Sequence, residues 1–342
     1  MSRSILRTAL VTGLAGLLPS CGDGTTGPSA LPTPTPVTHP VTVTAYLDEN
    51  ANGVFDATEG TRIPNAEIVI GSGKATTAVL TGQATVQAPE GSQALTVTAA
   101  SLPPFYRPPP APIPLTVPSG GPVMVPITIP RGSNRANVYM AFGDSITKGE
   151  PDVGDGNGYR QILQDMLRGH FGAGEVANEG RDATGTDFGA EIITTRLAAV
   201  RPTFTLIHYG TNDWNLPACN TVSKVPLPCF TTGSLRYMVQ EVNRSGGHAF
   251  LATLIPVNVG YDGRTPPERQ DWVDAVNVTI KQVASEEGAA LVDLNDAFKK
   301  SGLTGSALYV DHVHPTAAGY QIMAQTWFGA ISKAYSKILS EP

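Results

Sequence analysis

The sequence is poor in cysteine, has no surplus of positive charge and lacks a long apolar run. Only three cysteines occur in 342 residues, and no histidine lies between Cys219 and Cys229, which argues against a metal site there. The formal net charge is -6, so we do not expect nucleic acid as a partner. The N-terminal apolar stretch, residues 9–18, is too short to span a bilayer.

The N-terminus has the pattern of an export signal. Arg3 and Arg7 precede the apolar stretch, and Leu18-Pro19-Ser20-Cys21 resembles a bacterial lipobox with an unusual proline spacer. We therefore predict a lipoprotein signal peptide over residues 1–20 and lipidation of Cys21, which would anchor the protein to a membrane. An ordinary secretory signal with an unmodified Cys21 is the alternative. Both interpretations predict an exported protein, either lipid-anchored in the bacterial cell envelope or secreted.

The predicted export affects the expected bonding state of the other two cysteines. Cys219 and Cys229 form an even pair within one proline-containing loop, residues 217–231. Because an oxidising compartment favours disulfides, we predict that these two cysteines are bonded to each other. Two free thiols are the alternative.

The first third of the chain predicts a linker and a small domain. Alternating Thr and Pro predict an extended, Thr/Pro-rich linker over residues 21–40. Residues 41–130 contain short β-branched runs bounded by Gly, Pro or Asn, which predict a small all-β sandwich domain. The proline-rich segment 101–118 is expected to be an extended loop or edge, in which Phe105 and Tyr106 pack rather than bind glycans.

A loop of the calcium-binding pattern lies between the first two predicted strands. Residues 48–59 place oxygen-bearing side chains at loop positions 1, 3, 5, 9 and 12, with glycine at position 6. The run resembles the Asp-x-Asn-x-Asn-Gly loops of bacterial surface domains of the prealbumin-like β-sandwich type. A polar turn without metal is the alternative. The predicted ligands of a structural calcium ion are Asp48, Asn50, Asn52, the carbonyl of Val54, Asp56 and Glu59.

From residue 137 onward, strand and helix patterns alternate. Predicted strands over residues 138–142, 204–209, 250–255 and 289–294 are separated by apolar stripes at helical spacing. This alternation predicts a mainly parallel sheet with helices on both faces, that is, a three-layer α/β/α domain over residues 137–340. Such sheets bind ligands at the carboxyl ends of their strands.

Four short segments of this region predict a catalytic site. They are Gly143–Thr147, Asn178–Gly180, Gly210–Asp213 and Asp311–His314, and the first and third directly follow predicted strands. Ser145 is the candidate nucleophile, His314 the base that takes its proton, and Asp311 the carboxylate that orients the imidazole. An oxyanion is expected to bind the backbone N–H of Ser145, the N–H of Gly180 and the side-chain amide of Asn212.

The sequence also predicts the roles of three further residues in these segments. Asp144 and Asp213 are expected to fix the loop geometry through hydrogen bonds to backbone N–H groups. His312 is the rival of His314, but its ring is expected to point away from the serine.

Taken together, the four segments resemble the conserved blocks of the SGNH (GDSL) hydrolases, in the family's order. The resemblance runs from Asn137 to the C-terminal helix and implies a three-layer, flavodoxin-like fold that hydrolyses esters without a cofactor. It also implies that Ser145, Gly180, Asn212 and His314 occupy the family's signature positions, with Asp311 completing the triad. The chain contains no Gly-x-Ser-x-Gly segment, which argues against the common α/β-hydrolase lineage.

The expected function is that of an exported serine esterase acting through an acyl-enzyme. Its expected substrates are small acyl or acetyl esters, including O-acetylated polysaccharide. A lysophospholipase or lipase is the alternative among enzymes. A surface glycan-binding or adhesion lipoprotein without activity is the alternative of another class.

Overall fold

The computed structural model describes residues 36–149, 158–220, 229–263 and 265–333. The predicted signal peptide (1–20), Cys21 and most of the predicted linker (21–40) lie outside these ranges, as does the part of the predicted hydrolase domain after residue 333. All elements described below belong to one compact unit, Val37–Pro342. Within the described ranges, every helix is too short or too polar to cross a membrane.

Residues 38–127 form two small sheets. The first has the strand order β4 (Gln83–Pro89), β1 (Thr38–Leu47), β7 (Val123–Ile127), and the second has the order β3 (Gly73–Thr76), β2 (Glu67–Ile70), β5 (Gly91–Val97), β6 (Ile113–Val117). Neighbouring strands are antiparallel except for β1 and β7. Along β4, alternate residues are buried, which is the period-two pattern that predicts a strand.

The observed strands differ in places from the predicted ones. β1 begins at Thr38, because Thr38 and its neighbours already pair with β4, so the predicted linker ends before residue 38. The proline-rich segment contains β6, which pairs only with β5 and lies at the edge of its sheet. Tyr106 is buried, and the ring of Phe105 stacks on that of His248 with 4.4 Å between the centroids. Both aromatic residues therefore pack.

A five-stranded parallel sheet forms the centre of the remaining chain. Its strand order is β9 (Glu175–Gly180), β8 (Arg135–Gly143), β10 (Pro202–His208), β11 (His248–Ala252), β12 (Ala290–Val292). Numbered along the chain from β8, this is the order second, first, third, fourth, fifth, which is flavodoxin-like. The four strand pairs are all parallel.

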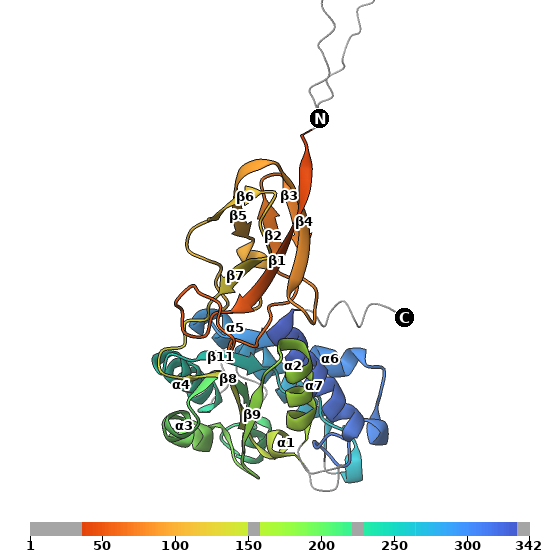
Figure 1. Ribbon diagram of the computed structural model, residues 1–342. Coiled ribbons are helices and arrows are strands. Elements are labelled where there is room, and N and C mark those ends of the chain that lie inside the picture. Colours follow the sequence, from red (N-terminus) through yellow and green to blue (C-terminus); the bar gives the residue numbers. More distant parts are fainter. Residues whose placement is uncertain (1–35, 150–157, 221–228, 264, 334–342) are drawn as a thin grey trace, which may run out of the picture. The chain divides into compact units, whose positions relative to one another are not determined.

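Helices cover both faces of this sheet (Figure 1). One core joins Tyr139 and Ala141 of β8 to the helices α2 (Tyr159–Phe171), α6 (Leu294–Lys300) and α7 (Ala317–Ser332). The other joins Met140 and Phe142 to α3 (Thr186–Val200), α4 (Thr231–Arg244) and α5 (Pro267–Glu287). Because successive side chains of a strand point to opposite faces, β8 contributes to both cores. The arrangement is the predicted three-layer α/β/α fold.

In the loop predicted to bind calcium, the carboxylates accept hydrogen bonds from the loop's own backbone. Asp48 accepts from the N–H groups of Asn52 and Gly53 at 3.2 and 2.7 Å, and Glu59 accepts from those of Glu49 and Asp56 at 3.0 and 3.2 Å. These side chains are the hard oxygen donors that calcium takes. In the described part of the chain, however, no three acidic, histidine or cysteine side chains are grouped so as to hold a metal ion. Calcium binding stays a prediction.

Calcium is expected to raise the melting temperature of the protein, because a ligand that binds only the folded state stabilises it by about 2.7 kcal/mol at 100 times its Kd. The measurement is a thermal melt with calcium chloride and with a chelator. Asp48→Asn should abolish the difference, whereas Asp271→Asn, an exposed substitution on α5, should keep it. Identical melts of the unmodified protein would favour the polar turn.

Candidate active site

Three of the four predicted segments lie side by side at the carboxyl end of the sheet. β8 ends at Gly143, and the strand register pairs Gly143 with Gly180 of β9 on one side and with His208 of β10 on the other. Three adjacent strand ends therefore bring Ser145, Gly180 and Asn212 to the same edge. The segment Asn178–Gly180 also ends a strand, although its sequence did not predict one.

Close backbone packing requires glycine at two of these strand ends. A Cβ atom on Gly143 would overlap Oγ1 of Thr147 and the carbonyl of His208, and one on Gly180 would overlap the backbone of Lys148. The short helix α1 (Ser145–Lys148) is consequently packed directly against the end of β9. Glycine lets the turn that carries Ser145 approach the end of β9 closely.

Asp144 holds the turn that presents Ser145. Its Oδ1 accepts a hydrogen bond from the N–H of Ile146 at 3.0 Å, and its carbonyl accepts from the N–H of Lys148, also at 3.0 Å. The contact to a backbone N–H is the one expected for Asp144. The side chain is completely buried, and burial raises the pKa of this carboxyl to about 7.

A continuous chain of hydrogen bonds links the serine, the histidine and the aspartate. Ser145 Oγ lies 2.8 Å from His314 Nε2, and His314 Nδ1 lies 2.7 Å from Asp311 Oδ2. Because the carboxylate can only accept, Nδ1 carries the proton and Nε2 is left to accept from the serine hydroxyl. This is the geometry needed to activate a hydroxyl nucleophile.

Asp311 stays ionised beside the imidazole. Burial raises the pKa of this carboxyl, but hydrogen bonds from the His314 ring and from the backbone N–H groups of His314 and Val313 outweigh it and hold the pKa well below its usual range. A charged carboxylate in this place can stabilise an imidazolium. His312 is more exposed, at 40% of its side chain against 16% for His314, and the ring that accepts the hydrogen bond from Ser145 is that of His314.

Two of the three predicted oxyanion donors, Asn212 and Gly180, donate hydrogen bonds within the protein. One amide hydrogen of Asn212 is donated to the carbonyl of Thr184 at 3.0 Å, which leaves the other for a ligand. The N–H of Gly180 donates to Oδ1 of Asn178 at 3.1 Å. Gly180 can therefore serve an oxyanion only when that bond is exchanged.

Asp213 holds the segment that carries Asn212 in place through hydrogen bonds. Its carboxylate accepts hydrogen bonds from the N–H and hydroxyl of Thr186, at 2.9 and 2.7 Å, and from the hydroxyl of Thr231 at 2.5 Å. The backbone contact expected for Asp213 is present, and two threonines at the starts of α3 and α4 extend it. Sequence reasoning missed these threonines and Thr184, although threonine ahead of a helical stripe is a helix-start signal.

The predicted disulfide joins Cys219 to Cys229 after the 3₁₀ helix η2 (Thr211–Asn215). The carbonyl of Cys219 accepts a hydrogen bond from Nε1 of Trp272 at 2.6 Å, which ties the disulfide to α5. Residues 221–228 of this loop lie outside the described ranges.

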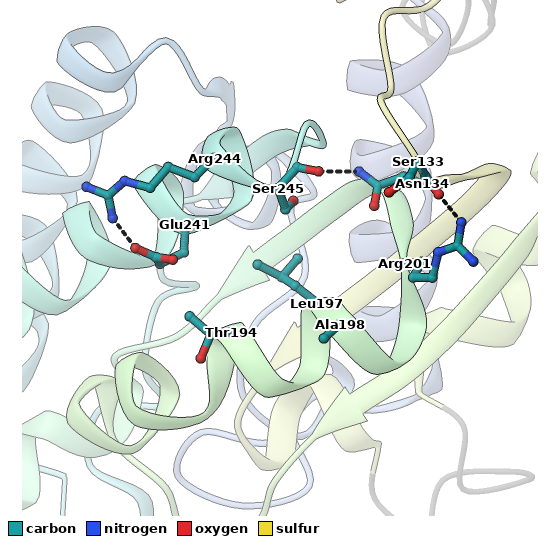
Figure 2. Close-up of a pocket in the computed structure, with 9 residues that line it drawn as sticks. All are labelled: Ser133, Asn134, Thr194, Leu197, Ala198, Arg201, Glu241, Arg244 and Ser245. Atoms are coloured by element: carbon teal, nitrogen blue, oxygen red, sulfur yellow. Dashed lines mark hydrogen bonds and ion pairs between the residues drawn. The ribbon is translucent and has the colours of Figure 1, made fainter.

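A separate cavity lies at the other end of the sheet. It has a volume of about 430 Å³ and lies between the ends of α3 and α4, as Figure 2 shows. Four of the lining residues come just before strands of the sheet. Ser133 and Asn134 lie before β8, Arg201 before β10 and Ser245 before β11. The cavity is therefore at the amino end of the strands, far from the end that carries Ser145.

Gly180→Ala should lower kcat by about 100-fold, because a Cβ atom must displace the Lys148 backbone and with it the nucleophile turn. Steady-state kinetics on a chromogenic ester measures the effect. Gly120→Ala is the matched control, since a Cβ atom there meets nothing within 4 Å. Equal kcat values for the two variants would contradict the packing argument.

Asp144→Asn should change how stability depends on pH. The folded protein holds the Asp144 proton up to about pH 7, whereas the unfolded chain releases it near pH 4. As the pH rises through this window, the free energy of unfolding of the unmodified protein should fall by up to about 4 kcal/mol relative to the variant. Urea unfolding of both proteins at about pH 5 and pH 8 measures roughly two thirds of this difference, because the unfolded chain has already lost most of the proton at pH 5. Parallel behaviour at the two pH values would refute it.

Comparison with known proteins identifies the family. The model of the GDSL-like lipase/acylhydrolase family matches residues 141–322, which is more than half of the chain. No curated protein matches the chain.

Several solved structures are similar to part of the chain. An acetylxylan esterase from Geobacillus stearothermophilus is 24% identical, with 59% of this chain and 97% of that one covered and a TM-score of 0.48. An α/β hydrolase from the metagenome of Lake Arreo is 20% identical, with coverage of 58% and 96% and a TM-score of 0.45. A protein of the G-D-S-L family from Desulfitobacterium hafniense is 18% identical, with coverage of 57% and 99% and a TM-score of 0.45. On the family match, the chain belongs to the GDSL-like lipase/acylhydrolase family and is an ester-hydrolysing enzyme.

Proposed function

We propose that this enzyme is a serine esterase that hydrolyses carboxylic esters through an acyl-enzyme on Ser145. The observation that carries the proposal is the hydrogen-bonded chain from Ser145 Oγ through His314 to Asp311, with distances of 2.8 and 2.7 Å. His314 takes the serine proton as Oγ attacks the ester carbonyl, and then returns that proton to the leaving alcohol. Water, activated by the same imidazole, hydrolyses the acyl-enzyme.

The negative oxygen of the tetrahedral intermediate is proposed to bind three donors. These are the backbone N–H of Ser145, the free amide hydrogen of Asn212 and the N–H of Gly180 after it leaves Asn178. Each such donor is worth about 3–4 kcal/mol of transition-state stabilisation. The exchange at Gly180 favours the transition state, because a charged oxygen is a stronger acceptor than the neutral amide oxygen of Asn178.

The surroundings of Ser145 support a short acyl group on a polar carrier, such as an O-acetylated glycan. Lys148, in the same helical turn, forms an ion pair with Asp182, and its carbonyl accepts from the side chain of Asn178 at 2.9 Å. Thr184 and Asn212 add further hydrogen-bonding groups. Polar side chains of this kind suit a hydroxyl-rich substrate better than a lipid.

One observation favours the second candidate, a lysophospholipase or lipase. A cavity of about 440 Å³ lies beside the turn that carries Asp311 and is lined in large part by apolar side chains, including Val257, Leu303 and Leu308. Asn258, another lining residue, donates to the carbonyl of Asp311 at 3.0 Å. A substrate whose acyl chain fills this cavity would have a longer acyl group than an acetyl ester.

We also propose that the protein acts outside the cytoplasm, anchored through a lipid on Cys21, with a calcium ion in the loop of residues 48–59. The disulfide between Cys219 and Cys229 supports export, because such bonds persist in oxidising compartments. Intact mass of membrane-extracted protein tests the lipid.

Ser145→Ala should lower the turnover of p-nitrophenyl acetate by about 10⁴-fold or more, because the acyl-enzyme cannot form. Ser92→Ala, at an exposed position of β5, is the control and should match the unmodified enzyme. Equal turnover by the Ser145 variant and the unmodified enzyme would rule out the serine as nucleophile. No turnover by either would favour a glycan-binding protein.

Acyl chain length should separate the two candidate substrates. An esterase of short acyl groups should show its highest kcat/KM on acetyl esters and release acetate from acetylated xylan or a similar glycan. A lipase should prefer p-nitrophenyl esters of eight carbons or more, whose added methylenes each contribute about 0.8 kcal/mol of burial. A rising series of kcat/KM values would contradict the short-acyl proposal.

A further inference from the structure

Helix α5 carries a buried arginine in its first turn. Arg269 is only 4% exposed, and its Nε is cut off from solvent without a hydrogen-bond partner. Its one side-chain hydrogen bond runs from Nη2 to the carbonyl of Thr211 and is 3.5 Å long. In the described part of the chain, no ion pair joins this guanidinium to a carboxylate. A buried cation with so few partners is costly to keep, which calls for a role at its location.

The first turns of α5 contact the segment that carries Asn212. Arg269 contacts the carbonyl of Thr211, which belongs to the peptide leading into Asn212. One turn further along the helix, the ring of Trp272 lies 5.8 Å from that of Trp214, edge to face, while its Nε1 donates to Cys219. Arg269 is the charged member of this set of contacts.

The negative charge of Asp311 also influences Arg269. Burial lowers the pKa of the guanidinium, and the charge of Asp311 opposes that shift. Asp213, a carboxylate on η2, is bound to Thr186 and Thr231.

We propose that Arg269 is a positioning residue of the esterase site, which holds the Thr211 carbonyl, and so Asn212, in place. The proposal rests on the proposed roles of Ser145 and Asn212. It requires no contact between Arg269 and the substrate.

Arg269→Gln tests the proposal. It should lower kcat about 10-fold with KM nearly unchanged, because Asn212 acts on the transition state rather than on the bound substrate. Arg269→Lys, which keeps the charge but not the planar fork, should also lower kcat with KM nearly unchanged.

Arg244→Gln is the matched control, since Arg244 lies at the amino end of the sheet and pairs with Glu241 (Figure 2). It should leave kcat and KM unchanged. If folded Arg269→Gln, judged by circular dichroism, has the kcat of the unmodified enzyme, the proposal is overturned. If Arg269→Gln does not fold, Arg269→Lys decides, and an unchanged kcat overturns the proposal. Activity of Ser145→Ala on the same ester separates failure of the esterase proposal from failure of this one.

Discussion

The site depends above all on the parallel pairing of β8 with β9 and β10. This register places Gly143, Gly180 and His208 side by side at one edge of the sheet. The turn that carries Ser145, the proposed oxyanion donor Gly180 and the segment leading to Asn212 are all located at these three strand ends. Because a parallel sheet aligns the carboxyl ends of strands that are distant in sequence, each segment can be short and still reach the others.

The polar groups under this edge are buried, and most are held by backbone rather than by opposite charges. Asp144 accepts from the backbone of its own turn, and Asp213 accepts from the starts of two helices. Arg269 has the weakest set of partners among them. Fixed dipoles and charges in a dry environment are worth more to a developing oxyanion than the same groups in water. The free-energy cost of burying these polar groups therefore arises at the place where the reaction is proposed to occur.

Sequence periodicity predicted the strands and helices that have a clean apolar pattern, and it missed those that do not. β9 contains the buried Glu179, which forms ion pairs with Arg181 and Arg196. This charged residue interrupts the apolar alternation that would have predicted the strand. α3 contains Gly189, where a Cβ atom would meet the ring of Tyr209, so a helix-weakening residue is kept for packing. The predicted strand at residues 289–294 ends at Val292, because Asp293 caps α6 by accepting from the N–H of Asp296.

The sequence by itself determined the residue types of the site, their order and the alternation that builds a parallel sheet. Ser145, His314 and Asp311 were identifiable because their chemistry is specific and local segments carry it. Only the tertiary structure decided that Ser145 meets His314 across 169 residues, that Gly180 is held by Asn178, and that Arg269 contacts the carbonyl of Thr211, next to Asn212. Periodicity reports which face of an element is buried, whereas hydrogen bonds between distant segments depend on strand register and on where each chain turn ends.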